Sequence, residues 1–203
     1  GGCPSYRENK MPDGTRMAWV NDSGLEGARR PLYGLEKIRD WIARGGSKLL
    51  LVEGEKTCDA LTHVMEDADP DSLLLSPMGG GEATSYIDWA PFFAEISYAK
   101  KSFETVIWQD ADSLLQRHDG TQVDRQKKFI TALSTSLAQG AADAGMSDLV
   151  TAINHITPPD GVKSGWDGAD AVSEGWSEAD ITALIHENIE VDMSNLKVHQ
   201  DAT

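Results

Sequence analysis

The 203-residue chain contains few cysteines and no long hydrophobic run. Cys3 and Cys58 are its only cysteines, which are too few for a disulfide scaffold or a cysteine-rich zinc site and fit a reducing compartment. No apolar run approaches the roughly 18 residues that a membrane-spanning helix needs, and the first residues lack the pattern of a signal peptide. We therefore expect a cytoplasmic protein with no membrane partner.

Positive charge is also scarce, since 18 lysines and arginines stand against 33 acidic residues and the formal net charge is −15. This balance excludes a protein that coats nucleic acid through bulk positive charge, because phosphate binding depends on Lys and Arg. The charge is uneven along the chain: residues 1–46 carry 8 basic and 6 acidic residues, and residues 47–203 carry 10 and 27. An acidic surface by itself indicates only solubility. Chemistry can therefore be assigned only to carboxylates at special positions of the fold.

The hydrophobic pattern predicts one main α/β domain. Continuous apolar runs, typical of strands buried on both faces of a parallel sheet, occupy residues 48–53, 72–76, 103–109 and 149–156. Helical spacing is found at residues 36–43, 56–68 and 123–144, and in part around residues 89–96. Strands that alternate with helices form crossover connections, so we predict a mostly parallel sheet of about four strands flanked by helices.

The predicted domain organisation has three parts. Residues 1–46 form a small leading element with a turn at 11–14 and a short strand at 16–20. Residues 47–175 form the main domain. Residues 176–203 form a C-terminal helix, which Ser177 and Asp180 open, and a flexible tail.

Three acidic residues directly follow or end two of the predicted strands. Glu53 closes the first strand, and Asp110 and Asp112 follow the third. Ligands of parallel sheets bind beyond the carboxyl ends of the strands, and two neighbouring carboxylates that converge there need a cation. Their oxygens suit Mg²⁺ or Mn²⁺ bridged to phosphates, the ions of phosphoryl transfer. Gly54, next to Glu53, permits a tight turn and the close approach of a ligand. An Asp-x-Asp pair such as Asp110 and Asp112, taken alone, is more often two solvated acids of a loop.

Several short motifs occur in a characteristic order. They are RRPLYGLEKI (29–38), LLLVEGEKTCDAL (49–61), GGG (79–81), DWAPF (88–92), VIWQDAD (106–112) and GWDGADAV (165–172). In this order they resemble the Toprim domain, and specifically the Toprim segment of phage, prophage and plasmid primase or primase-helicase proteins. The resemblance implies a Toprim-like, Rossmann-like fold for residues 47–175.

The resemblance also implies roles for individual acids. The glutamate of the EG motif, Glu53, is expected to be the general acid/base of nucleotidyl transfer and to lie at the metal. Asp110 and Asp112 are expected to be metal ligands, with Asp167 or Asp170 as a further ligand. The implied cofactor is Mg²⁺ or Mn²⁺.

The candidates for binding phosphate or nucleic acid are basic side chains and glycines. Lys56 would hold a phosphate beside the metal, although an exposed helix lysine would look the same. The glycines Gly54, Gly79, Gly80 and Gly81 would let the backbone approach a nucleotide, and an ordinary flexible connection is the alternative for the last three. Arg125, Lys127 and Lys128, with Arg29 and Arg30, are the candidates for a DNA backbone, where paired charges on a solvated face would look similar.

The function implied by the resemblance is that of a magnesium-dependent nucleotidyltransferase of the DNA primase type, in phage or plasmid DNA replication. DNA and nucleotides are the expected partners, and a replicative helicase in the same or another chain is a further candidate. Two alternatives stay open: a Toprim nuclease that uses the same acids, and a non-catalytic module that binds DNA or a replication partner. The non-catalytic module is favoured by the net charge of −15 and by the loop after Asp112, in which the first glycine is Gly120.

Overall fold

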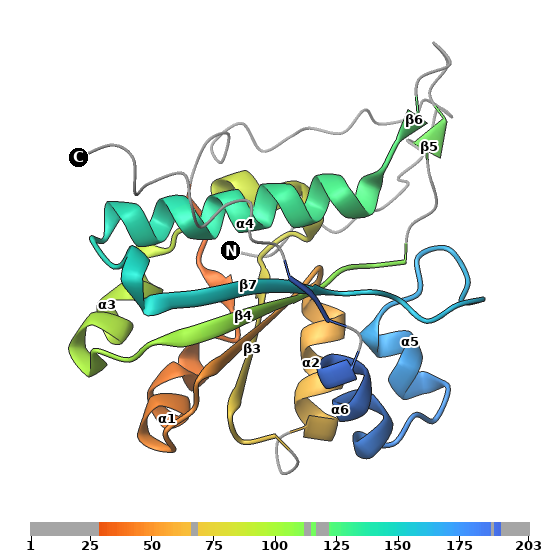
Figure 1. Cartoon of the computed structure of the whole chain (residues 1–203), viewed down its shortest axis with the longest axis horizontal. Helices are drawn as coiled ribbons and strands as arrows, with labels where there is room; N and C mark the ends of the chain where they lie inside the picture. The colour runs from red at the N-terminus through yellow and green to blue at the C-terminus, as the bar shows by residue number, and fades with distance from the viewer. Residues whose placement is uncertain (1–28, 66–68, 112–114, 117–121, 188, 192–203) are drawn as a thin grey trace, which may run out of the picture.

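A central sheet with helices on both faces forms the described part of the chain (Figure 1). The computed structural model describes residues 29–65, 69–111, 115–116, 122–187 and 189–191. The strand order is β1-β3-β2-β4-β7-β8. The strands are β1 Leu32–Tyr33, β2 Lys48–Val52, β3 Ser72–Pro77, β4 Phe103–Trp108, β7 Val150–Ile156 and β8 Ile189–Val191. A separate pair joins β5 Leu115–Gln116 to β6 Gln122–Val123.

The four predicted strands are the four parallel strands of this sheet. β3, β2, β4 and β7 pair in parallel, while β1 and β8 pair antiparallel with β3 and β7. In β2 every residue is buried, because a parallel strand covered on both faces has no solvent side. The predicted α/β fold with a mostly parallel sheet is therefore confirmed. The sequence pattern missed the short strands β1, β5, β6 and β8. The three residues of β8 follow the last helix and return to the sheet edge.

The helices cover the sheet in two layers, and each layer has its own core. The first layer holds α1 Ile38–Ala43, α3 Ala90–Ala99 and α4 Arg125–Asp143; the second holds α2 Glu55–Met65, α5 Gly168–Ser173 and α6 Glu178–Glu187. Alternate strand residues face opposite layers, so Leu51 packs in the first core and Leu50 in the second. Cys58 of α2 is buried, and burial raises the pKa of its thiol to about 11.

Helix starts follow the capping pattern of the sequence. Asp124 accepts a hydrogen bond from the Lys127 backbone N–H at 2.9 Å and opens α4. Ser177 and Asp180 form the predicted reciprocal cap of α6, and the hydrogen bonds from Ser177 lower the pKa of Asp180. A further helix, α5, was not predicted, and it begins after Asp167. No helix within the described ranges is long and apolar enough to cross a membrane.

Residues 32–43, within the predicted leading element, join the first core. Leu32, Ile38 and Trp41 are buried there. The predicted turn at 11–14, the strand at 16–20 and the tail from residue 192 onward lie outside the described residues. The predicted domain boundaries therefore stay predictions.

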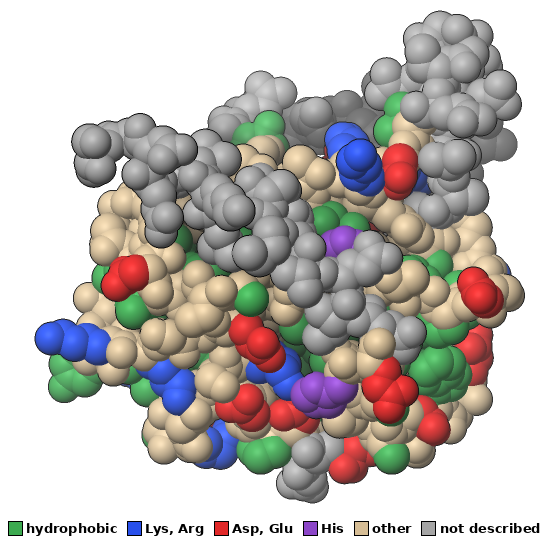
Figure 2. Space-filling view, in the orientation of Figure 1, with side chains coloured by type: hydrophobic (Ala, Val, Ile, Leu, Met, Phe, Trp, Pro, Cys, Tyr) green, Lys and Arg blue, Asp and Glu red, His purple; other side chains and the backbone are tan. Residues whose placement is uncertain are grey.

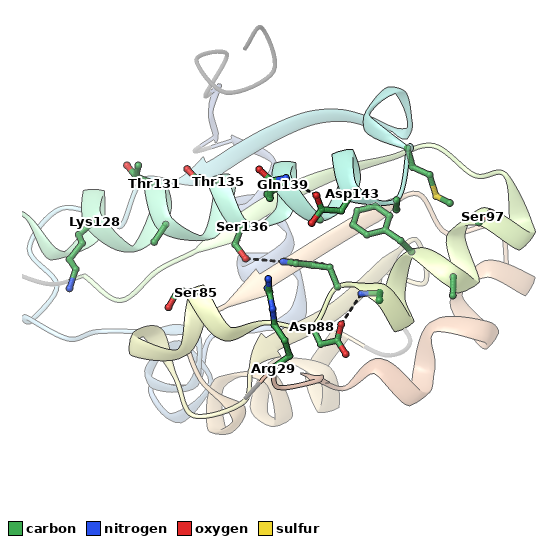
Figure 3. A pocket seen from close by; sticks show the side chains of 18 of the residues that line it. Arg29, Ser85, Asp88, Ser97, Lys128, Thr131, Thr135, Ser136, Gln139 and Asp143 are labelled. Carbon is green, nitrogen blue, oxygen red and sulfur yellow. Dashed lines mark hydrogen bonds between the residues drawn. The ribbon is translucent and has the colours of Figure 1, made fainter. Parts of the chain in front are cut away.

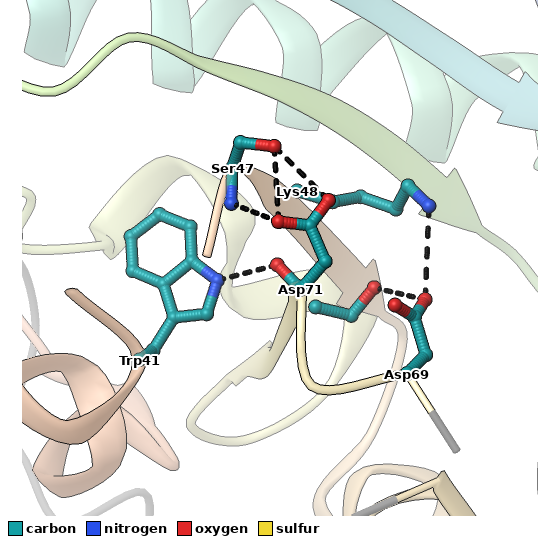
Figure 4. Close-up of polar contacts among 6 residues, drawn as sticks. Trp41, Ser47, Lys48, Asp69 and Asp71 are labelled. Atoms are coloured by element: carbon teal, nitrogen blue, oxygen red, sulfur yellow. Dashed lines mark hydrogen bonds and ion pairs between the residues drawn. The ribbon is translucent and has the colours of Figure 1, made fainter. Parts of the chain in front are cut away.

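The amino ends of β2 and β3 are joined by a cluster of polar contacts (Figure 4). The indole of Trp41 donates to the Asp71 carbonyl at 2.6 Å, and the Ser47 backbone N–H donates to the Asp71 carboxylate at 2.7 Å. Lys48 Nζ lies 3.6 Å from Asp69 Oδ2, and both side chains are almost fully buried. This cluster ties the start of β2 to the turn before β3, at the end of the sheet opposite the predicted acids.

Candidate active site

Glu53 and Asp110 meet at the carboxyl edge of the sheet. β2 and β4 are neighbouring parallel strands whose last residues, Val52 and Trp108, are paired, so the residues that follow lie side by side. The Asp110 backbone N–H donates to Glu53 Oε2 at 3.4 Å, at the long end for such a bond. Both side chains are half-buried. Asp112 lies outside the described residues, so its place beside them stays a prediction.

The segment after β4 is held against the segment that precedes α5. The Ala111 backbone N–H donates to the Trp166 carbonyl at 2.8 Å, and the Gly165 N–H donates to the Ala111 carbonyl at 3.0 Å. These two bonds form an isolated antiparallel bridge. They bring the GWDGADAV motif beside Ala111, at the edge of the sheet where β4 ends.

Asp167 and Asp170 both have partners within the protein. Asp167 caps α5 by accepting from the Asp170 backbone N–H at 2.8 Å, and its other oxygen accepts from Thr57 Oγ1 at 2.7 Å. Asp170 pairs with Lys163 Nζ at 3.0 Å, and this hydrogen bond is the main cause that lowers the pKa of Asp170. The contacts join α5 to the start of α2. A metal-ligand role for either aspartate stays a prediction.

Lys56 is exposed at the start of α2. Its positive charge contributes to the lowered pKa of Asp170. The structure thus places Lys56, Glu53 and Asp110 around one end of the sheet.

The glycine loop lies directly against Glu53. A Cβ atom added to Gly81 would lie 2.4 Å from Glu53 Oε1, so a larger residue cannot occupy this position without moving the carboxylate. Gly79 and Gly80 have φ of +97° and +74°, in the left-handed region that favours glycine. The Gly79 N–H donates to Glu55 Oε1 at 2.8 Å and fastens the loop to α2. Glu55 had no predicted role, although it lies within the LLLVEGEKTCDAL motif.

Replacing Gly81 by alanine is expected to displace the Glu53 carboxylate and break its contact with the Asp110 N–H. The free energy of unfolding should change by less than about 1 kcal/mol, because the displaced atoms end a flexible side chain. The Asp110 amide resonance in a ¹⁵N–¹H spectrum should move. Glu82→Ala is the matched control, since it changes the next, exposed residue of the same turn. An Asp110 amide that moves equally in both variants contradicts this arrangement.

The basic side chains predicted to bind a DNA backbone lie before β1 and at the start of α4. Arg29 and Arg30 donate to the backbone carbonyls of Ile87 and Met78, at 3.0 and 3.4 Å, and so hold the segment before β1 in place. Lys128 lies 3.8 Å from Glu82 in an exposed ion pair, which contributes little to stability. Arg125 and Lys127 are exposed on the first turn of α4. Figure 2 shows lysines and arginines in small separate groups with acidic residues among them.

A groove of about 1290 Å³ runs between α3 and α4 (Figure 3). Trp89 lines it and donates from its indole to Ser136 Oγ at 2.9 Å. Lys127 and Lys128 lie at the start of α4 and also line it. The predicted carboxylates that the structure describes do not line this groove. It is therefore separate from the acidic edge.

Within the described ranges, no group of three His, Cys, Asp or Glu side chains is placed to hold a metal ion. Asp112 lies outside these ranges, so the predicted centre of three carboxylates stays a prediction. Comparisons with protein-family models, with curated proteins and with solved structures found no match to this chain.

Proposed function

We propose that this chain is a Toprim-type domain that uses Mg²⁺ to act on nucleic-acid phosphates, as the primase part of a phage or plasmid replication protein. The observation that carries the proposal is the contact between the Glu53 carboxylate and the Asp110 backbone at adjacent strand ends. The residues in contact are those of the EG and DAD motifs. The reaction is nucleotidyl transfer during primer synthesis.

The donors at this edge suit a hard divalent cation. Carboxylate oxygens are the protein ligands that Mg²⁺ prefers, and the ion keeps further positions for water and phosphate oxygens. Glu53 and Asp110 would hold the Mg²⁺ ion together with Asp112, which follows Asp110 by two residues. When bound, Mg²⁺ would neutralise phosphate charge and favour ionisation of the attacking hydroxyl.

The protein side chains supply proton transfer and orientation. Glu53 accepts the proton of a primer 3′-hydroxyl while the hydroxyl oxygen bonds to the α-phosphorus of a nucleoside triphosphate and pyrophosphate leaves. The Asp110 N–H and the close approach of Gly81 limit where the Glu53 carboxylate can lie. Lys56 attracts the negative phosphates at the start of α2. Gly54 leaves space on its Cβ side, since no atom of a described residue other than its chain neighbours lies within 4 Å of that position.

The test is incubation of the protein with end-labelled single-stranded DNA, ribonucleoside or deoxynucleoside triphosphates, and Mg²⁺ or Mn²⁺. Extended or newly made oligonucleotides, which disappear when EDTA is added, are the expected result. Shortened DNA without extension would mean that the protein is a nuclease and not a nucleotidyltransferase. Measurable binding of DNA or a helicase with no product under either metal would contradict catalysis and identify a binding module.

A further inference from the structure

A smaller cavity of about 420 Å³, here named the β4–β7 pocket, lies between α4 and the carboxyl ends of β4 and β7. Its lining includes Gln109, Ile130, Thr131 and Ile156, with Lys127 at the first turns of α4. The volume lies within the range of small-molecule sites, roughly 300–1,000 Å³. The pocket combines apolar surface with several polar side chains, a composition that suits a nucleoside better than a free phosphate.

Gln109 is a buried polar side chain that lines this pocket. It is 2% exposed, and its Nε2 donates to the Ile156 carbonyl at 2.6 Å. This bond fixes the orientation of the amide, yet the buried Oε1 has no hydrogen-bond partner among the residues that the structure describes. A buried carbonyl oxygen without a donor is unfavourable. A bound group that presents an N–H or O–H would remove this cost.

The position of Gln109 connects the pocket to the acidic edge. Successive side chains of an extended strand point to opposite faces. Ile107, two residues before Gln109, packs in the core on the α4 side, and Gln109 lines a pocket on that same side. The next residue is Asp110, whose backbone contacts Glu53. Consecutive residues, Gln109 and Asp110, therefore belong to the β4–β7 pocket and to the acidic edge.

We propose that the β4–β7 pocket binds the nucleoside part of the incoming nucleotide, with Gln109 Oε1 accepting a hydrogen bond from it. This inference rests on the proposed function, which places the phosphates at the neighbouring edge. Ile130 and Pro158 provide apolar surface for a base. Lys127, an exposed lining residue, attracts the phosphate groups. The donor is either a base N–H or a sugar hydroxyl, both of which suit an amide oxygen.

The test is calorimetric titration of the whole protein, in Mg²⁺ and without DNA, with ATP, CTP, GTP, UTP and their deoxy forms. Gln109→Leu is expected to weaken binding of the preferred nucleotide at least about 10-fold, the effect of losing one buried hydrogen bond. Loss of a ribose-over-deoxyribose preference in this variant would assign the contact to the sugar. Loss of a preference among the four bases would assign it to the base.

Gln109→Leu also removes the bond to Ile156 and could unfold the protein, so a second variant is needed. Thr131 is exposed on α4 and lines the pocket, so Thr131→Trp should fill it and weaken binding to a similar extent. Thr135→Trp is the matched control: Thr131 lines both the pocket and the larger groove, whereas Thr135, one turn further along α4 and also exposed, lines the larger groove and not the pocket. It should leave the dissociation constant within about twofold of the wild type.

The failures of the two proposals are distinguishable. Wild-type protein that binds no nucleotide, or a folded Thr131→Trp variant that binds as tightly as the wild type, overturns the pocket assignment. If extension activity persists in that variant, the proposed function survives without the pocket. If nucleotide binding depends on Thr131 but no extension or cleavage occurs, the pocket survives and catalysis does not.

Discussion

The Glu53→Gln variant is expected to transfer nucleotides about 10²–10⁴-fold more slowly than the wild type, the usual contribution of a general acid or base. The amide has the size of the carboxylate and still accepts the Asp110 N–H, so the fold should be preserved. It cannot accept the proton of the attacking hydroxyl, and it is a weaker ligand for Mg²⁺. Initial rates of primer extension and calorimetric titration with Mg²⁺ measure the two losses separately.

Glu55→Gln is the matched control for this variant. Glu55 is two residues away and accepts from the Gly79 N–H, which a glutamine oxygen also does. Its activity should therefore fall far less. Equal activity of Glu53→Gln and wild type would remove Glu53 from the reaction. An unchanged Mg²⁺ affinity in Asp112→Asn would likewise remove the predicted metal centre.

Asp69→Ala is expected to lower the free energy of unfolding by about 3 kcal/mol or more, the largest stability effect that we predict. The substitution leaves the Lys48 ammonium, whose side chain is only 6% exposed, without its carboxylate 3.6 Å away. It also removes the acceptor of the Ser72 hydroxyl, which donates to Asp69 Oδ2 at 2.6 Å. A buried charge that has lost its partner costs more free energy than the pair contributed. Urea denaturation followed by circular dichroism measures the change.

Two further variants separate charge burial from simple loss of a contact. Glu95→Ala breaks the Arg39–Glu95 pair, whose atoms lie 2.7 Å apart on the surface, and should leave stability almost unchanged because exposed pairs contribute little. The double variant Lys48→Met with Asp69→Leu removes both charges and should recover much of the lost stability. A destabilised double variant, equal to Asp69→Ala, would show that packing and not charge is responsible.

The pair at Arg39 has a defined pH dependence. The hydrogen bond from Arg39 lowers the pKa of Glu95 below its ordinary value. A lowered folded-state pKa means that the contribution of this carboxylate is present above its unfolded pKa and is lost as the pH falls through the folded value. Any small effect of Glu95→Ala should therefore vanish in acid.

The sequence alone determined the four parallel strands, the main helices and the chain positions of the acids, because these depend on local periodicity. Four or five consecutive apolar residues, as in β2, make a buried parallel strand in whatever order the strands later assemble. Residues that end such strands must lie at one edge, so Glu53 and Asp110 were predictable as neighbours of that edge. The Ser177 and Asp180 cap was predictable for the same reason, since its hydrogen bonds join residues three apart.

Only the tertiary structure decided which side chains meet there. The strand order places β2 beside β4, so the Asp110 N–H reaches Glu53 across 57 positions of sequence. Thr57 reaches Asp167 across 110 positions, and the buried Gln109 amide reaches β7 across 47. Periodicity contains no information about such contacts, because they depend on how the elements pack and not on the residues next to them. Three features are therefore properties of the folded chain: the pairing of β8 with the sheet, the hydrogen bond between the glycine loop and Glu55, and the pocket at Gln109.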